Sequence, residues 1–241
     1  MNILIITGGS KGIGKAIAKK YASKNYKVYS LSRSTVDLEN ITQISVDLSN
    51  LKETESSFKM LLTEFNIEQV SSITLINNAG RIGKISSLEN LKTADIAKTI
   101  QLNTITPLVL SSLFISILEK TNCKKQIINI SSGAAKTPYQ GWSVYCTSKA
   151  GVDMMTKTIA NEQIAIKNSV KCVSIYPGVV DTNMQTDIRN TQEKDFNSLQ
   201  RFKDLKENNE LYSTEFVAEK IYTIDTKNQL KSGDIVDLRS F

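Results

Sequence analysis

Apolar residues along this chain fall into two kinds of segment that alternate from one end to the other. Short runs rich in Ile and Val predict strands, at residues 3–6, 27–31, 43–46, 73–76, 126–130, 171–175 and 234–236. Longer amphipathic stretches predict helices, at residues 13–22, 51–65, 94–118, 144–166 and 215–223. This alternation predicts an α/β fold, a doubly wound, Rossmann-type parallel sheet of about seven strands with helices on both faces.

The same pattern bears on domain organisation. Neither an internal repeat nor a Pro/Gly/Ser-rich linker divides the 241 residues, so we expect a single domain over residues 1–241. The one shift in composition is the polar and strongly charged segment 183–209. It follows the sixth predicted strand, whose carboxyl end borders the ligand crevice of an open α/β sheet, so we expect a loop-and-helix insertion on the substrate side.

Composition narrows the chemistry that this fold can perform. The chain has no histidine, which excludes Ser-His-Asp and Cys-His catalysis and most metal sites, and we expect no metal. Its three cysteines show no Cys-x2-Cys spacing and suggest neither a disulfide framework nor a zinc site. Acid–base work therefore falls to Tyr, Lys, Asp or Glu. The net charge of +6 is spread along the chain without a tight basic run, so we expect no nucleic-acid partner.

Apolar stretches also bear on location. No stretch approaches the roughly 18 or more apolar residues of a membrane span, and residues 108–118, which serines interrupt, are interpreted as a buried helix. Met1 leads directly into the first predicted strand, without the basic and apolar regions of a signal peptide. We therefore expect a cytoplasmic protein with no membrane partner.

A glycine-rich segment, Thr-Gly-Gly-Ser-Lys-Gly-Ile-Gly at residues 7–14, joins the first predicted strand to the first predicted helix. Gly8, Gly12 and Gly14 would allow a tight turn and a close approach to a pyrophosphate, with free N–H groups of the helix N-terminus as donors. The Gly-x3-Gly-x-Gly spacing is a weak signal by itself. Its position at a strand–helix junction strengthens the prediction of a dinucleotide site.

Cofactor choice depends on the end of the second predicted strand. Enzymes that use NAD place a carboxylate there for the ribose hydroxyl, and enzymes that use NADP place an arginine nearby for the phosphate. No Asp or Glu occurs between Gly8 and Val36, whereas Lys11 and Arg33 supply two cations. The segment predicts NADPH/NADP+ as cofactor; the alternative is that both cations are merely exposed surface residues.

A second group of residues carries acid–base chemistry. Tyr145 and Lys149, in Tyr-Cys-Thr-Ser-Lys, are four residues apart on a predicted helix, so the phenol and the ammonium share one face. A phenol has a pKa of about 10, and a neighbouring cation is expected to lower it. Ser132 precedes the tyrosine by thirteen residues. This acid–base group and the glycine-rich segment together indicate hydride transfer, whereas Tyr-x3-Lys alone occurs often by chance.

In these and other segments the chain resembles the short-chain dehydrogenase/reductase family over essentially its whole length. The matching segments are residues 7–14, Asp47-Leu48, Asn77-Asn78-Ala79-Gly80, Asn103, Ile130-Ser131-Ser132, residues 145–149 and Pro177-Gly178. The chain further resembles the branch of bacterial benzil reductases that form (S)-benzoin and of sepiapterin reductases. That closer resemblance lies in residues 141–146, 177–185, 205–209 and 232–237.

The resemblance implies an NADPH-dependent carbonyl reductase. In such an enzyme Tyr145 donates the proton, Lys149 holds the nicotinamide ribose, Ser132 bonds the substrate carbonyl, and Asn103 supports a water that relays protons towards Lys149. Ser131 is the alternative to Ser132. Asp47 is expected to bond the adenine amino group and Thr182 the nicotinamide amide. The full set of implied cofactor contacts is Gly8, Ser10, Lys11, Gly12, Ile13, Gly14, Arg33, Asp47, Asn77, Ala79, Gly80, Tyr145, Lys149, Pro177, Val180 and Thr182.

Three residues bear on the substrate. Trp142, beside Tyr145, and Met184 are candidate pocket residues, because an indole stacks well on an aryl or pterin ring, although Trp142 could equally be a core residue. Asp237 matches a position that sepiapterin reductases use to anchor the pterin, or it is a surface carboxylate. We predict reduction of 1,2-diketones of benzil type, with a sepiapterin-type pterin reductase and a non-catalytic NADP(H)-binding sensor as alternatives. The resemblance also implies a homo-oligomer, a dimer or a tetramer.

Overall fold

The computed structural model describes residues 1–240, in which seven strands form one parallel sheet in the order β3-β2-β1-β4-β5-β6-β7. All seven predicted strands and the predicted Rossmann-type fold are confirmed. The strands are β1 (Asn2–Thr7), β2 (Lys27–Ser32), β3 (Ile41–Ser45), β4 (Ser72–Asn77), β5 (Lys124–Ile130), β6 (Val170–Tyr176) and β7 (Ile235–Asp237).

The predicted helices are also present. The α-helices are α1 (Gly12–Ala22), α2 (Leu51–Thr63), α3 (Thr93–Ile100), α4 (Thr106–Leu118), α5 (Ser143–Glu162), α6 (Asn183–Arg189), α7 (Leu199–Glu207) and α8 (Thr214–Thr226). A π-helical turn, η3 (Gln101–Ile105), joins α3 to α4, so the helix predicted over residues 94–118 is continuous but locally widened. Short 3-10 turns are η1 (Ile67–Gln69), η2 (Leu88–Asn90), η4 (Gly133–Ala135), η5 (Glu193–Asp195) and η6 (Leu238–Ser240).

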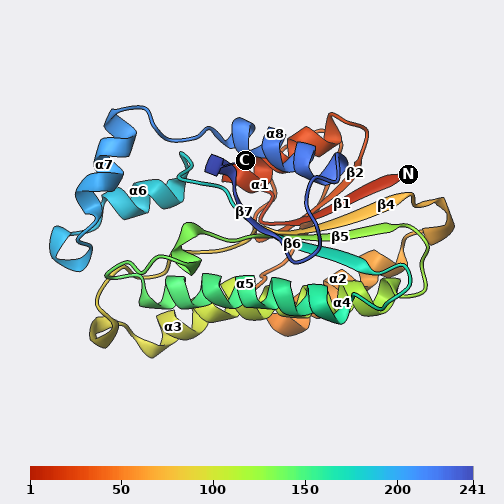
Figure 1. Ribbon diagram of the computed structural model, residues 1–241, viewed down its shortest axis with the longest axis horizontal. Coiled ribbons are helices and arrows are strands. Elements are labelled where there is room, and N and C mark those ends of the chain that lie inside the picture. Colours follow the sequence, from red (N-terminus) through yellow and green to blue (C-terminus); the bar gives the residue numbers. More distant parts are fainter. Residues whose placement is uncertain (241) are drawn as a thin grey trace.

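Helices cover both faces of the sheet because alternate residues of the inner strands point to opposite sides. In β1, Ile3 and Ile5 pack with side chains of α2, α4 and α5, whereas Leu4 and Ile6 pack with side chains of α1 and α8. Figure 1 shows these two helical layers, with α1 and α8 on one side of the sheet and α4 and α5 on the other. The two-sided burial explains why the strands are apolar at nearly every position.

The strand order positions a ligand crevice. The chain passes from β3 at one edge to β4 beside β1, so the connections after β1 and β4 leave the sheet towards opposite faces. A crevice opens at such a switch point, beyond the carboxyl ends of the strands. The glycine-rich segment follows β1 there, and residues 78–83 follow β4.

The expectation that no segment is long and apolar enough to span a membrane needs correction. The helical run Thr93–Leu118 is long and apolar enough to cross a membrane by length and composition. One such helix is weak evidence, because the core helix of a soluble protein passes the same test. Here Leu110, Phe114 and Leu118 are completely buried in the core against the sheet, as in the core helix of a globular protein, whereas Leu108 is exposed.

The charged segment 183–209 forms α6, η5 and α7, as a loop-and-helix insertion should. In Figure 1 α6 and α7 lie together at one end of the molecule, beyond the body of the sheet. Three buried side chains of the segment, Ile188, Phe196 and Phe202, form a small core with Trp142 and Tyr145. This packing places the insertion against the amino-terminal end of α5.

Candidate active site

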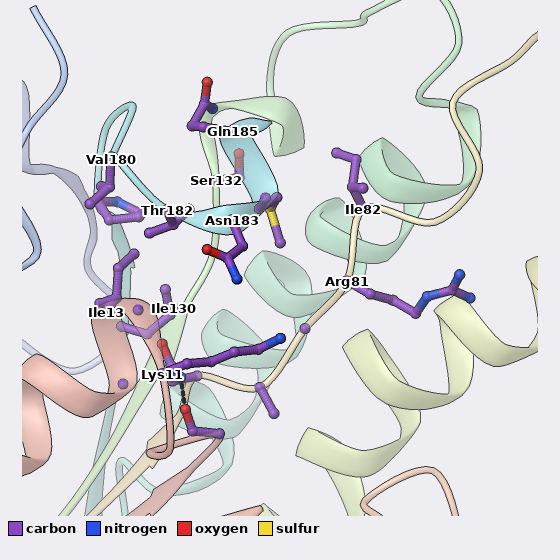
Figure 2. Close-up of a pocket in the computed structure, with 18 of the residues that line it drawn as sticks. Lys11, Ile13, Arg81, Ile82, Ile130, Ser132, Val180, Thr182, Asn183 and Gln185 are labelled. Carbon is purple, nitrogen blue, oxygen red and sulfur yellow. Dashed lines mark hydrogen bonds between the residues drawn. The ribbon is translucent and has the colours of Figure 1, made fainter. Parts of the chain in front are cut away.

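A cavity of about 980 Å³ lies at the carboxyl ends of the strands and extends from the glycine-rich segment to α6 and α7. Figure 2 shows Ser132, Thr182 and Asn183 on one side of it and the side chain of Lys11 extending across it, while Arg81 points away. The structure brings most of the predicted site residues to this cavity: Gly8, Ser10, Lys11, Gly12, Ile13, Gly14, Arg33, Asp47, Ala79, Gly80, Ser132, Trp142, Tyr145, Lys149, Pro177, Val180, Thr182 and Met184. Asn77, Asn103 and Asp237 do not line it.

The glycine-rich segment forms a close-packed turn at the start of α1. Gly8 and Gly12 have φ of +71° and +54°, values that favour glycine. A Cβ on Gly14 would lie 2.3 Å from the Gly8 carbonyl oxygen, so only glycine lets α1 start this close to β1. The first turn of α1 holds no acidic residue and no side-chain cap, which leaves its N–H groups available to an anion. These residues fit a dinucleotide pyrophosphate.

Cationic and hydroxyl side chains gather at the end of β2. Arg33 and Lys11 are exposed at the cavity wall, and the hydroxyls of Ser10 and Ser34 lie 3.4 Å apart between the two loops. The nearby Asp47 carboxylate accepts bonds from the Ser49 hydroxyl and amide, at 2.7 and 3.0 Å, and these bonds lower the pKa of Asp47. The group therefore combines two cations, two hydroxyls and the Asp47 carboxylate at this end of the cavity.

Asn77 is a case where the structure differs from the expectation. Asn77 is the last residue of β4, and its side-chain amide is buried towards α4, where it donates to the Asn129 Oδ1 at 2.8 Å and to the Ser111 hydroxyl at 3.3 Å. The next residue, Asn78, lines the cavity instead and donates to the Thr7 carbonyl at 2.9 Å. Consecutive residues at a strand end point in opposite directions, so the shift by one residue is a consequence of the pleat.

The acid–base group lies at the middle of the cavity. Tyr145 and Lys149 lie one turn apart on α5 and are 7% and 6% exposed, with the Lys149 Nζ 5.8 Å from the phenol ring centroid. Ser132 follows β5 and lines the cavity, where its hydroxyl accepts from the Ala134 amide at 3.2 Å and acts to lower the pKa of the Tyr145 phenol. The Ser131 hydroxyl instead donates to the backbone carbonyl of Lys149 at 3.4 Å. This geometry favours Ser132 over Ser131 as the partner of the phenol.

The pKa of the phenol does not follow the expectation from sequence. Burial raises the pKa of Tyr145 to about 12, and the Ser132 hydroxyl only partly opposes this shift. The ammonium does not offset this, because Lys149 directs its Nζ to the Ile130 carbonyl at 2.8 Å, and burial lowers the pKa of Lys149 itself to about 8. At neutral pH the phenol therefore holds its proton and the lysine holds its charge, which is the state that a proton donor needs.

Asn103 lies behind the cavity wall, 1% exposed, inside the π-turn η3. Its amide donates to the Arg81 carbonyl at 2.8 Å and accepts from the Arg81 amide at 2.9 Å, which holds the loop after β4 against α5. Pro107 lies four residues later and has no N–H for the Asn103 carbonyl. The Asn103 carbonyl thus lacks its α-helical partner, and π-turns of this kind are frequent at functional sites.

The far end of the cavity is aromatic. The Trp142 indole stacks on Phe196 at 4.9 Å between ring centroids, and its edge meets the Tyr145 ring at 5.6 Å. Tyr139 and Phe202 complete this aromatic wall. Trp142 is 5% exposed yet lines the cavity, so both interpretations of this residue hold: it is a core residue that also forms the pocket wall. Met184 is half-buried and packs against the same cluster of side chains.

Asp237 is not brought to the cavity. Its carboxylate accepts two bonds from the Arg239 Nε, at 2.9 and 3.0 Å, and pairs with the Arg239 guanidinium end. Arg239 lines the cavity in its place, beside Gly133. No local pattern identifies Arg239 or Phe202, since they reach the cavity only through the packing of α7 and of the carboxyl-terminal segment. Phe196 does not line the cavity and supports its wall by stacking on Trp142.

Comparison with known proteins shows that the chain is similar to reductases of the short chain dehydrogenase family. The sequence model of the family described as short chain dehydrogenase matches residues 2–193. The chain is 41% identical to benzil reductase ((S)-benzoin forming) of Bacillus subtilis (strain 168), over 100% of both chains. It is 37% identical to the Bacillus cereus protein of the same name over 98% of each chain. It is 25% identical to sepiapterin reductase of Xenopus laevis, over 98% of this chain and 94% of that one.

Solved structures agree with the fold. The chain superposes with a TM-score of 0.84 on the crystal structure of a short chain dehydrogenase/reductase from Saccharomyces cerevisiae, at 24% identity, covering 98% of this chain and 96% of that one. Identity at this level supports the fold alone.

Proposed function

Because the chain belongs to the short-chain dehydrogenase family and is an oxidoreductase acting on carbonyl and alcohol groups, we propose that it reduces 1,2-diketones of benzil type with NADPH. The observation that carries the proposal is the position of Tyr145: its phenol lies between the glycine-rich cradle and an aromatic wall, in one continuous cavity. A dinucleotide at one end and an aryl ketone at the other would meet at this phenol.

Each residue of the group has a task in carbonyl reduction. NADPH, when bound, supplies the hydride to the carbonyl carbon. Ser132 bonds the carbonyl oxygen and orients it towards Tyr145, which donates its proton to that oxygen as negative charge develops. The charged Lys149 stabilises the phenolate that Tyr145 becomes. Asn103 holds the Gly80–Arg81 backbone that closes the cavity beside Lys149.

The relatives named benzil reductase support the diketone substrate, and so does the aromatic wall of Tyr139, Trp142, Phe196 and Phe202. The pterin alternative is weaker because the carboxylate that would anchor a pterin, Asp237, is already paired with Arg239 and lies outside the cavity. A sensor without catalysis has no need for the acid–base group assembled around Tyr145.

The first test is the loss of NADPH absorbance with benzil, run beside sepiapterin and beside NADH. We expect rapid turnover of benzil with NADPH, with benzoin as product in one enantiomeric form. Turnover of sepiapterin without benzil turnover would instead assign the chain to pterin reduction. NADPH binding with no turnover of either compound would remove the proposed substrate class.

The preference for NADPH over NADH gives a separate prediction at Arg33. Arg33 and Lys11 are the cations beside Ser10 and Ser34, where the ribose phosphate would bind. A hydrogen bond to a charged group contributes about 1.5–3 kcal/mol, so Arg33→Ser should lower kcat/KM for NADPH by roughly 10- to 100-fold. The value for NADH, which has no such phosphate, should change little.

The matched control is Lys24→Ser, which removes an exposed cation near the end of α1 that does not line the cavity. Lys24→Ser should leave kcat/KM unchanged for both NADPH and NADH. An equal loss with NADPH and NADH in Arg33→Ser would show that Arg33 does not bind the phosphate.

We also propose that the protein is a homo-oligomer, because the apolar side chains of Leu108 on α4 and Met154 on α5 are exposed on the outer helical layer. Analytical ultracentrifugation would measure its mass.

A cytoplasmic location agrees with three free cysteines among residues 1–240.

A further inference from the structure

A buried carboxylate lies one helical turn beyond the catalytic pair. Tyr145, Lys149 and Asp153 succeed one another at intervals of four residues on α5, so their side chains lie along one face. All three are buried, and Asp153 is only 8% exposed. A carboxylate is almost never buried at this level unless it has partners or a function. The role proposed above for the acid–base group does not account for Asp153.

Two hydroxyls of β6 hold this carboxylate in place. The Ser174 hydroxyl donates to one Asp153 oxygen at 3.0 Å, and the Tyr176 phenol donates to the other by a short bond. Ser174 and Tyr176 are alternate residues of the strand and face α5 together. Hydrogen bonds from hydroxyls stabilise an ionised carboxylate without neutralising it, so the negative charge remains available to act on its surroundings.

The cation one turn before this charge on the same face of α5 is Lys149, and the two groups interact electrostatically. Lys149 is not in direct contact with Asp153, because the Lys149 Nζ bonds the Ile130 carbonyl at 2.8 Å and no ion pair joins the two residues within residues 1–240. The other groups around the ammonium bring no second carboxylate. They are the Tyr145 ring, the Gly80 backbone and the Asn103 amide, while the Arg81 guanidinium is turned away to Asp95.

Charges behind Asp153 are either paired or distant from Lys149. The Lys136 Nζ lies 5.4 Å from the Tyr176 ring centroid, on the side of the phenol near β7. Asp237, the register partner of Tyr176 on β7, is paired with Arg239. The carboxylate of Asp153 is therefore the single unpaired negative charge, among the described residues, that is aligned with Lys149 on α5.

From this geometry we propose that Asp153 is a positioning residue that keeps Lys149 charged, and thereby keeps Tyr145 able to donate its proton, at neutral and mildly alkaline pH. Its charge acts through space, one turn behind the ammonium, and it touches neither substrate nor cofactor. Burial lowers the pKa of Lys149 to about 8, and the charge of Asp153 opposes that shift. Without the carboxylate the lysine would lose its proton closer to neutrality.

The test is the pH profile of kcat/KM in Asp153→Asn, which keeps the shape and leaves both hydroxyls a partner. Reduction needs the charged lysine, so wild-type activity should fall as pH rises through about 8. Loss of a nearby opposite charge lowers a lysine pKa by about one unit or more. In Asp153→Asn the fall in kcat/KM should therefore begin about one pH unit lower than in the wild type. The ratio of variant to wild-type activity should then be about five-fold smaller at pH 8 than at pH 6.

Ser174→Ala is the matched control, because it removes one bond to the carboxylate and leaves the charge. Its profile should match that of the wild type. An Asp153→Asn profile that is lowered equally at all pH values, or not at all, would overturn the proposal and leave Asp153 a structural residue.

A second readout does not depend on turnover. Lys149 lines the cofactor end of the cavity, so NADPH affinity, measured by fluorescence, should weaken above pH 8 in the wild type and about one unit lower in Asp153→Asn. The inference rests on the proposed reductase activity only for the kinetic profile. Failure of benzil as a substrate would remove the substrate assignment, whereas unshifted NADPH binding in a folded Asp153→Asn would remove the role of Asp153. Should that variant not fold, Asp153→Glu, which retains the charge, should lose kcat/KM over the same alkaline pH range as the wild type. A fall of kcat/KM displaced by a full pH unit in Asp153→Glu would count against the proposal.

Discussion

Replacing Tyr145 with phenylalanine should lower kcat for benzil by about 10³-fold while NADPH binding stays within a few-fold of wild type. General acid catalysis by a positioned side chain contributes 10²–10⁴-fold, and the upper part of that range applies here because the described part of the cavity offers no histidine or unpaired carboxylic acid beside Ser132. The variant removes one oxygen from a ring that remains packed on Trp142 at 5.6 Å. The fold and the cofactor cradle should therefore survive.

The measurements are single-turnover reduction of benzil and NADPH fluorescence titration of the same sample. Tyr222→Phe is the matched control, because Tyr222 on α8 packs on Tyr21 at 5.1 Å and does not line the cavity. It should retain wild-type turnover. A Tyr145→Phe enzyme that works within ten-fold of wild type would mean that another group supplies the proton.

Replacing Gly14 with alanine should disrupt the cofactor cradle. Helix propensity alone favours alanine over glycine by about 0.5–1 kcal/mol, which would predict a more stable protein. The contacts decide against it: the new Cβ would lie 2.3 Å from the Gly8 carbonyl oxygen and 2.4 Å from the Asn78 amide nitrogen. The Gly8 carbonyl is backbone and cannot move without separating α1 from β1, so we expect a loss of about 3 kcal/mol in the free energy of unfolding and a Tm lower by about 10 °C.

The affinity of Gly14→Ala for NADPH should also fall, by about 100-fold, because a displacement of about 1 Å in a binding site is enough for such a loss. Gly133→Ala is the control, since its Cβ would meet nothing closer than the Arg239 guanidinium at 3.7 Å. It should keep the wild-type Tm. Differential scanning fluorimetry with and without NADPH reports both quantities, and an unchanged Tm and affinity in Gly14→Ala would show that the turn is less rigid than its contacts indicate.

The sequence by itself determined the elements and the chemical identity of the site. The period of the apolar residues predicted all seven strands and the helical layers, because a sheet covered on both faces needs apolar strands, and a helix that covers it needs one apolar stripe. Tyr145 and Lys149 could be paired from spacing alone, since residues i and i+4 share a helical face. The glycine-rich segment could be placed because its turn is local in the chain.

Only the tertiary structure decided what depends on contacts between distant segments. The phenol of Tyr145 has a raised pKa because burial outweighs the influence of the Ser132 hydroxyl, and burial cannot be inferred from spacing. Phe196 stacks on Trp142, and Arg239 reaches the cavity beside Gly133, through the packing of segments that are far apart in sequence. Asp153 gained a role only when β6 brought two hydroxyls to its carboxylate. Side-chain orientation, desolvation and through-space charge are set by the assembled fold, whereas periodicity and local turns are set by the chain.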